Sequence, residues 1–266
     1  MKNDPPLLAV LIDADNVPAR YVDAIFKEIT SFGEPSVRRI YGDFSDTRLK
    51  KWSGILADHA IVPIHQPANT VGKNASDIAL VIDGMDLLHS GKVGGFVLVS
   101  SDSDFTRLAS RIREQGLPVY GIGERKTPSA FRKACKRFIF IENIVNSEQS
   151  SIHISENNAT SDIPKKEMSV EANGKASPEK PVPINGPPSK SVPLILAAMK
   201  SISTEDGSYN LGPIGQKLMA DNPDFDARSY GCQNLSTLLE KTGQFKLDRS
   251  GTEIRVRRAV NGGQTK

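Results

Sequence analysis

Over its first 146 residues the chain alternates short apolar runs with stretches of helical spacing, and this alternation constrains the fold most. Leu7–Ile12 and Phe96–Ser100 are continuous apolar runs, as expected of strands that are buried on both faces. Val17–Phe32 and Ser76–Leu88 have apolar residues at helical spacing, and a glycine follows each. Further strands are expected at 36–41, 61–65, 117–122 and 138–141, and further helices at 48–59, 105–115 and 129–135. Alternating strands and helices predict an α/β fold with a mostly parallel sheet that is covered by helices on both faces.

The composition changes near Ser147. Residues 147–189 contain no aromatic residue and are rich in Pro, Ser, Asn, Lys and Glu, so they bury too little apolar surface to offset the entropy of ordering. We expect a first domain at 5–146, a flexible linker at 147–189 and a second domain at 190–259. The second block has helical stretches at 194–202, 211–221 and 229–242, followed by a hairpin of strands at 245–248 and 253–256. This order predicts a small winged helix-turn-helix domain.

The composition also excludes several classes of protein. Hydrophobic residues make up 38% and charged residues 24% of the 266 residues, which is typical of globular proteins. The apolar runs are too short to span a bilayer, and the first residues lack the apolar region of a secretory signal. Two cysteines are too few for a disulfide framework or a zinc cluster. We therefore expect a cytoplasmic protein with no membrane partner, and the net charge of +3 is too small to indicate a polyanion partner by itself.

Carboxylates follow two of the apolar strands directly. The first strand leads into Asp13, the strand at 96–100 leads into Asp102 and Asp104, and Asp77 opens the helix before that second strand. In open parallel sheets, ligands bind beyond the carboxyl ends of the strands, where the strand order reverses. If the two strands are neighbours there, the four carboxylates converge, which is costly unless a cation lies between them. Because no His or Cys accompanies them, the oxygen ligands favour Mg²⁺ or Mn²⁺ over zinc.

Each of these acids also has a structural alternative. An Asp after a strand is often a helix N-cap, and both Asp77 and Asp104 stand at the start of expected helices. For one residue alone, capping explains the position as well as catalysis does, whereas a metal site better explains the whole set. Four nearby residues stay undecided between a role in the site and an ordinary turn or helix position: Asp15, Asp83, Ser100 and Ser101.

Three segments carry these acids: Leu11–Val17 (LIDADNV), Lys73–Asp83 (KNASDIALVID) and Val99–Phe105 (VSSDSDF). Their order and spacing resemble the NYN family, in particular its LabA-like branch, over about residues 5–145. Ser101 stands where many relatives have Gly. The resemblance implies a PIN-like nuclease fold, Mg²⁺ or Mn²⁺ as cofactor and RNA as substrate. It further implies these site residues, with the first four as metal ligands and the last orienting the site or the scissile phosphate: Asp13, Asp77, Asp102, Asp104 and Asn16.

Two other functions compete with this interpretation. The first is a non-catalytic RNA-binding regulator that keeps both domains without turnover, since several NYN members are known only as regulators. The second is a phosphatase, because a strand followed by Asp-x-Asp also resembles the first motif of haloacid dehalogenase-type enzymes. In that family Asp13 would be the nucleophile and Asp15 the general acid. The family also needs a hydroxyl and a lysine, for which Ser45 and Lys73 are only loose counterparts.

Basic residues gather after the strand at 117–122. Because they follow a strand, we expect them near the same carboxyl edge as the acids, where a phosphate backbone would meet both the cation and a basic rim. A solvated helix face explains any one of them equally well. Six lie between positions 125 and 137, with no acid among them: Arg125, Lys126, Arg132, Lys133, Lys136 and Arg137.

Three segments of the second block, Ser208–Gly212, Asp226–Leu239 and Phe245–Leu247, resemble the OST-HTH domain, also called LOTUS. The resemblance implies RNA binding, or a protein partner, since some members bind proteins instead. We expect Tyr230 to pack in the core. The flexible linker would let one RNA contact both domains. Positive charge lies on the expected hairpin, as an RNA-contacting wing requires: Lys246, Arg249, Arg255, Arg257 and Arg258.

Overall fold

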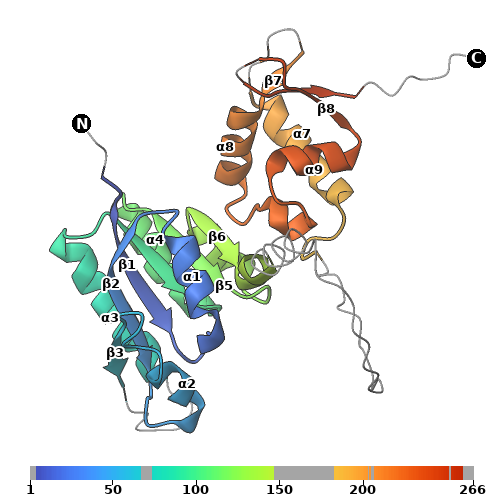
Figure 1. The fold of residues 1–266 in the computed structure, drawn as a ribbon. Coiled ribbons are helices and arrows are strands. Elements are labelled where there is room, and N and C mark those ends of the chain that lie inside the picture. Colours follow the sequence, from blue (N-terminus) through green and yellow to red (C-terminus); the bar gives the residue numbers. More distant parts are fainter. Residues whose placement is uncertain are drawn as a thin grey trace, which may run out of the picture.

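The computed structural model describes residues 4–66, 74–146, 183–202, 204, 207–251 and 253–259. Its first domain contains a six-stranded parallel sheet in the order β3-β2-β1-β4-β5-β6 (Figure 1). The strands are β1 (Leu7–Asp13), β2 (Glu34–Gly42), β3 (Val62–His65), β4 (Gly95–Val99), β5 (Val119–Gly123) and β6 (Arg137–Phe140). No helix in these ranges is long and apolar enough to cross a membrane.

The strand order reverses between β1 and β4. From β1 the chain builds outward through β2 and β3, and it then returns to place β4 on the other side of β1. Leu8 of β1 is in register with Gly95 of β4, and Ile12 with Val99. The residues that follow these two strands therefore meet at one point on the carboxyl edge of the sheet.

Helices cover both faces of the sheet. Successive side chains of β1 point to opposite faces: Leu8, Val10 and Ile12 belong to one core, and Ala9 and Leu11 to the other. The first face is covered by α1 (Val22–Ile29), α2 (Lys50–Ser53) and the helical residues 141–146, and the second by α3 (Ala75–Ser90), α4 (Thr106–Glu114) and α5 (Ser129–Ala134). The predicted α/β fold is confirmed.

The helix expected at 48–59 is much shorter than predicted. A 3-10 turn, η2 (Thr47–Leu49), precedes α2, and the helix ends before Gly54. Residues 54–60 form turns in which Ala60 has a positive φ of 50°. Burial of Leu49, Trp52 and Ile61 against the first core satisfies the apolar pattern without a continuous helix.

The second domain packs three helices against a three-stranded sheet of order β7-β9-β8. After η4 (Pro188–Ser191), its elements are α7 (Val192–Lys200), β7 (Tyr209–Asn210), α8 (Leu211–Asp221), η5 (Ala227–Tyr230), α9 (Leu235–Thr242), β8 (Phe245–Asp248) and β9 (Arg255–Arg258). The third helix begins at 235, later than the predicted 229, because Gly231 has a φ of 71° and Asn234 caps α9 through Thr237 N at 2.8 Å. Tyr230 is 4% exposed, so its predicted core position is confirmed.

The second domain contacts the first along β6 and α1. Phe138 N, on the edge strand β6, donates a hydrogen bond to Pro223 O at 2.8 Å. Arg228 forms two hydrogen bonds to the Glu28 carboxylate of α1, at 2.8 and 3.0 Å. Arg132 of α5 also forms an ion pair with Asp224. Polar contacts from three elements of the first domain, β6, α1 and α5, thus join the two domains.

Part of the segment expected to be a linker belongs to this contact. Residues 183–189 are described, and Ile184 is 7% exposed and packs with the second core of the first domain. Composition does not reveal this contact, because one apolar side chain among polar neighbours gives no periodic signal. The rest of the expected linker, residues 147–182, lies outside the described residues.

Candidate active site at the carboxyl edge of the sheet

Asp13, the last residue of β1, is held by four hydrogen-bond donors and is only 2% exposed. Its Oδ2 accepts from Asn16 Nδ2 at 2.6 Å and from Ser100 Oγ at 2.7 Å. Its Oδ1 accepts from the backbone amides of Asp15 and Asn16, at 3.1 and 3.3 Å. Burial raises the pKa of Asp13, although the bonds from Ser100 and Asn16 oppose this rise. The turn after β1 and the end of β4 therefore fix one carboxylate in a single orientation at the switch point.

The turn after β4 orders two further carboxylates. Asp102 N donates to Ser100 Oγ at 3.0 Å, and Asp104 N donates to Asp102 Oδ1 at 2.8 Å. Asp102 is therefore the N-cap of η3 (Ser103–Phe105), a role that the sequence favoured for Asp104. Asp104 is exposed, and its Oδ2 accepts from Asn74 Nδ2 at 3.2 Å. A structural role for Asp102 leaves its second carboxylate oxygen available for chemistry.

Asp77 lies in the first turn of α3, whose N-cap is Asn74. Burial, and after it the negative charges of four other carboxylates, together raise the pKa of Asp77 to about 6. In decreasing order of effect, these neighbours are Asp13, Asp102, Asp104 and Asp15. The structure thus brings the acids together as the sequence predicted. Their negative charges repel one another, and a bound cation would relieve this repulsion.

The acids offer oxygen donors, which are the ligand type that Mg²⁺ and Mn²⁺ prefer. Among the described residues, no group of three or more His, Cys, Asp or Glu side chains is arranged to hold a metal ion directly. Magnesium usually keeps several of its waters and binds through only one or two carboxylates. The roles of the four acids as metal ligands stay a prediction.

The residues left undecided take different positions. Ser100 orients Asp13, and Ser101 Oγ accepts from Glu124 N at 2.8 Å, so both serines shape the site. Asp15 is exposed and lies 3.9 Å from Arg48 in a weak ion pair. Asp83 is turned away from the cluster, where it accepts hydrogen bonds from Arg39 and Tyr41 of β2. Asp83 is therefore a structural residue that bridges α3 and the sheet.

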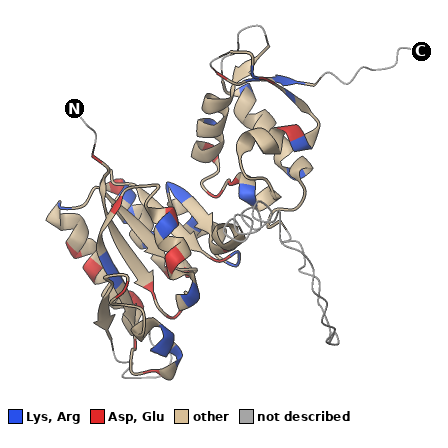
Figure 2. Ribbon diagram, viewed as in Figure 1, with Lys and Arg blue, Asp and Glu red and all other residues tan. Residues whose placement is uncertain are grey.

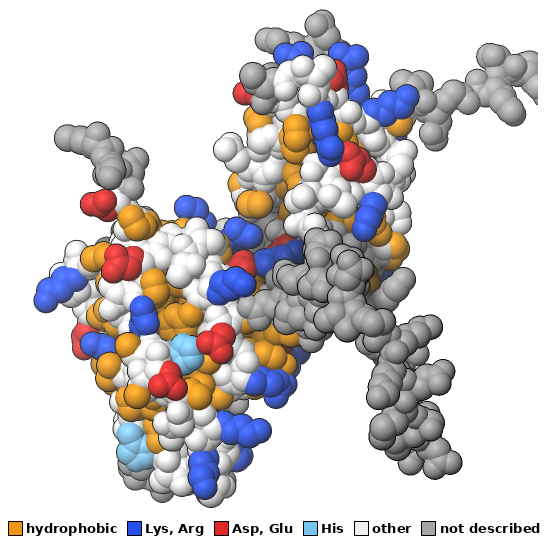
Figure 3. Space-filling view, in the orientation of Figure 1, with side chains coloured by type: hydrophobic (Ala, Val, Ile, Leu, Met, Phe, Trp, Pro, Cys, Tyr) orange, Lys and Arg blue, Asp and Glu red, His pale blue; other side chains and the backbone are white. Residues whose placement is uncertain are grey.

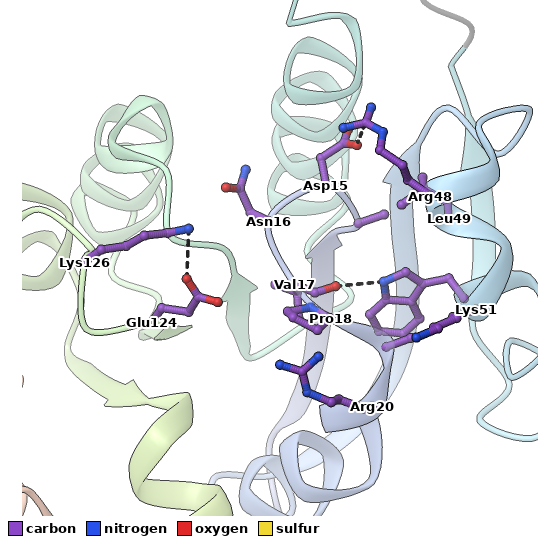
Figure 4. A pocket seen from close by; sticks show the side chains of 13 residues that line it. Asp15, Asn16, Val17, Pro18, Arg20, Arg48, Leu49, Lys51, Glu124 and Lys126 are labelled. Atoms are coloured by element: carbon purple, nitrogen blue, oxygen red, sulfur yellow. Dashed lines mark hydrogen bonds and ion pairs between the residues drawn. The ribbon is translucent and has the colours of Figure 1, made fainter. Parts of the chain in front are cut away.

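A pocket of about 400 Å³ adjoins the acidic cluster (Figure 4). Asp15 and Asn16 form one wall, and basic side chains from three connections line the pocket together with apolar residues and Glu124. Figure 2 shows the acidic residue at the end of β1 and the basic residues on α2. Of the basic residues, only Lys126 was predicted, and Arg20, Arg48 and Lys51 were missed. The available signal was that these residues follow β1 and β2, whose carboxyl ends lie at this edge.

The expected single basic rim is wrong. Arg125 and Lys126 do follow β5 at the carboxyl edge, but Lys136 and Arg137 lie at the opposite edge, where β6 begins beside Val119 and Tyr120. A parallel strand must start at the edge opposite to where the preceding strand ended, so α5 carries the chain across. Of the two basic residues on α5, Lys133 is exposed, whereas Arg132 is engaged by Asp224 at the domain contact.

The wing of the second domain carries an exposed positive face. Val256 is fully buried, and the residues on either side of it in β9, Arg255 and Arg257, are exposed. Lys246 of β8 lies directly opposite Arg257, and like charges in this arrangement destabilise a strand pair unless an anion binds them. Arg258 is also exposed, whereas Arg249 is paired with Glu240 at 2.8 Å. Basic side chains gather at the end of this domain that lies away from the first domain (Figure 3).

Comparisons with known proteins match both domains to families. Residues 7–142 match the model of the NYN domain, and residues 189–256 match that of the OST-HTH/LOTUS domain. A protein of unknown function from Vibrio parahaemolyticus is 19% identical, with a TM-score of 0.44; the match covers 52% of this chain and 94% of that chain. No curated protein matches the sequence.

Proposed function

Since the chain belongs to the NYN domain family, a nuclease-type family, we propose that it is a metal-dependent ribonuclease that hydrolyses RNA phosphodiester bonds. The observation that carries the proposal is the convergence of carboxylates between β1 and β4, where the charge of Asp77 is opposed by Asp13, Asp102 and Asp104. The OST-HTH domain adds a module of a kind that binds RNA.

In this proposal Asp13 and Asp102 hold Mg²⁺ or Mn²⁺, with Asp77 and Asp104 contributing charge and further ligands. An ion held there would supply Lewis-acid chemistry toward a phosphate oxygen and toward the water that serves as the nucleophile. Asn16 and Ser100 keep the Asp13 carboxylate in one orientation through their hydrogen bonds of 2.6 and 2.7 Å. Preorganised groups of this kind cost no rearrangement during the reaction.

The exposed cations give the RNA two places to bind. Arg125 and Lys126 stand at the carboxyl edge beside the acids, and the wing of the second domain presents Arg255 and Arg257. Phosphate contacts of this kind position an RNA without selecting its sequence. Because polar contacts along β6 join the domains, the RNA would follow a path set by the protein surface and not by a free tether.

The phosphatase alternative is less well supported. The hydroxyl of Ser45 is exposed and donates to its neighbour Asp43, and Lys73 lies outside the described residues. Asp15, which would be the general acid, is exposed beside Arg48. The non-catalytic alternative keeps the same surfaces and differs only in turnover.

Cleavage of single-stranded RNA by the purified full-length chain tests the proposal. Cleavage in Mg²⁺ or Mn²⁺ that EDTA abolishes, and that the Asp102→Asn variant lacks, would support a ribonuclease. RNA binding without cleavage in either metal would favour the non-catalytic regulator. Hydrolysis of p-nitrophenyl phosphate, together with no cleavage of the RNA, would favour the phosphatase. Equal cleavage by the parent and the variant would indicate a contaminating nuclease and remove the support.

A further inference from the structure

The pocket beside the acidic cluster combines two kinds of wall. Four basic side chains line it against only two acidic ones, Asp15 and Glu124. The cations come from three separate connections at the carboxyl edge: Arg20, Arg48, Lys51 and Lys126. The remaining wall is apolar and comes from Val17, Pro18, Leu49 and Trp52. An apolar wall next to convergent polar groups is the usual composition of a small-ligand site, and about 400 Å³ is within the usual size range.

Two of the four cations are already neutralised by the protein. Lys126 pairs with Glu124 at 2.9 Å, and Arg48 pairs with Asp46 at 2.7 Å. Arg20 instead donates to the hydroxyl of Tyr21, which carries no charge, at 2.7 Å. Lys51 has no acidic partner among the residues that the structure describes. Arg20 and Lys51, which lie away from Asp15 in Figure 4, therefore offer uncompensated positive charge to a ligand.

The apolar wall is built rigidly. Trp52 is 2% exposed, and its Nε1 donates to Val17 O at 2.9 Å, which ties α2 to the turn after β1. Val17 and Leu49 are also buried, whereas Pro18 is half-buried and presents part of its ring. A flat ring system can lie along this wall with little loss of conformational freedom in the protein.

The pocket shares residues with the acidic cluster. Asn16 lines the pocket, and its side chain donates to Asp13 Oδ2 at 2.6 Å. Asp15 also lines it, and its backbone amide donates to Asp13 Oδ1 at 3.1 Å. A ligand in the pocket would thus lie directly beside the proposed site of cleavage, and the pocket lining does not include the four acids proposed to bind the metal.

We propose that this pocket binds one nucleotide, with its phosphate at Lys51 and Arg20 and its base against Pro18 on the apolar wall. A phosphate forms charge-assisted hydrogen bonds with cations, and a base packs against an apolar surface, so a nucleotide matches both walls. The proposal rests on the proposed function, because the nucleotide would be the neighbour of the scissile phosphate in a bound RNA. A free mononucleotide has the same chemistry.

Trp52 provides a direct readout because it is the only tryptophan in the chain and forms part of the pocket. The full-length protein would be titrated in EDTA, so that no cleavage occurs, with a short oligoribonucleotide, a nucleoside monophosphate, the nucleoside and inorganic phosphate. We expect a saturable change in fluorescence with the oligoribonucleotide and the monophosphate, a weaker one with phosphate, and none with the nucleoside. Lys51→Ala and Arg20→Ala should each weaken binding about tenfold, as loss of one charge-assisted hydrogen bond does.

Lys50→Ala is the matched control. Lys50 is the exposed neighbour of Lys51, carries the same charge and does not line the pocket. Lys50→Ala should bind as the parent does, and unchanged circular dichroism would show that all variants fold. No saturable change with any ligand, or equal weakening by Lys50→Ala and Lys51→Ala, would overturn the proposal. A response to the mononucleotide alone would overturn the assignment to RNA.

The binding titration and the RNA cleavage assay can fail independently, so they test the pocket and the nuclease separately. Binding in EDTA by a chain that never cleaves RNA would keep the pocket and reject the nuclease. Cleavage that Lys51→Ala leaves unchanged, together with no fluorescence response, would keep the nuclease and reject the pocket.

Discussion

Carboxylates at two regions of the molecule have opposite surroundings. At the domain contact, Glu28 and Asp226 both face Arg228, and the side chains of all three are less than one-fifth exposed, at 15%, 10% and 19%. At the carboxyl edge of the sheet, Asp13 and Asp77 face other carboxylates, with hydroxyl, amide and backbone groups as partners. The carboxylates at the domain contact are neutralised by an arginine of the protein, and we call this the closed region. The carboxylates at the sheet edge face like charges, and we call this the open region.

The pKa values reflect this difference. Burial lowers the pKa of Arg228, but the hydrogen bonds and charges of Glu28 and Asp226 outweigh it and raise the pKa overall. Burial and like charge together raise the pKa of Asp77 to about 6. A closed network contributes to the fold, whereas an open one is relieved only by a proton or an external cation. The contrast separates structural charge from charge that is available for function.

The largest effect is expected from Asp102→Asn, which removes charge from the open region. If the carboxylate binds the catalytic ion, single-turnover cleavage of RNA should fall by about 10²–10³-fold, the equivalent of several kcal/mol of transition-state stabilisation. The fold should persist, because Asn can also accept the capping bond from Asp104 N.

Asp15→Asn is the control for that prediction. Asp15 is exposed and weakly paired with Arg48, so its substitution should reduce the rate much less. An inactive Asp15→Asn variant beside a fully active Asp102→Asn variant would reverse the order and favour the phosphatase.

Arg228→Met tests the closed region. Removing the guanidinium leaves Glu28 and Asp226 unpaired at the domain contact, and breaking a buried pair in this way costs about 3 kcal/mol. Denaturant unfolding of the full-length chain should reveal the loss, and amide exchange at Phe138, which bonds Pro223, should accelerate. Arg249→Met breaks only a surface pair with Glu240 and should change stability by less than about 1 kcal/mol. Equal effects of the two substitutions would mean that the domain contact adds no stability.

The pH dependence of stability should differ in the Asp77→Asn variant. A carboxyl whose pKa is raised in the folded state binds more protons there than in the unfolded state between its ordinary pKa and about 6. In the absence of divalent ions, Asp77 therefore makes the parent less stable as the pH rises from about 4 to about 6. Because Asp77 is only half-buried, solvent screening limits the difference, and Asp77→Asn should be more stable by about 1 kcal/mol at neutral pH.

Thermal unfolding of both proteins from pH 4 to pH 8 in EDTA measures this effect. The advantage of Asp77→Asn should shrink as the pH falls to 4, where Asp77 is protonated in the folded state. An advantage that is constant over the whole range would trace to packing and not to repulsion.

The smallest effect is expected at the wing. The double substitution Arg255→Ala and Arg257→Ala removes two exposed cations, so the slope of log K against log salt should become shallower by about 1.4, at roughly 0.7 per contact with single-stranded RNA. Affinity for one RNA would be measured across a salt series. Arg249→Ala, whose arginine is paired with Glu240, should leave the slope near that of the parent. An unchanged slope in the double variant would point to a protein partner for this surface.

The sequence by itself determined the fold and the place in the sheet where the acids meet. Continuous apolar runs such as Leu7–Ile12 can be strands only where both faces are covered, and the intervening helical spacing leaves a parallel sheet as the solution. Asp13 and Asp102 follow two such strands directly, so their meeting needed only that β1 and β4 pair, which they do. Local patterns succeed here because each residue's role depends on its own strand and on one general rule of topology.

Tertiary structure decided the residues whose roles depend on the other end of the chain or on the other face of the sheet. Asp83 of α3 forms an ion pair with Arg39 of β2, and Arg132 forms one with Asp224 of the second domain. Ile184 is buried against the core of the first domain. Arg20 and Lys51 join one pocket although 30 residues separate them, because β1 and β2 both end at the same edge. Charge and burial in a folded chain are set by neighbours in space, and composition along the sequence does not record which partners those will be.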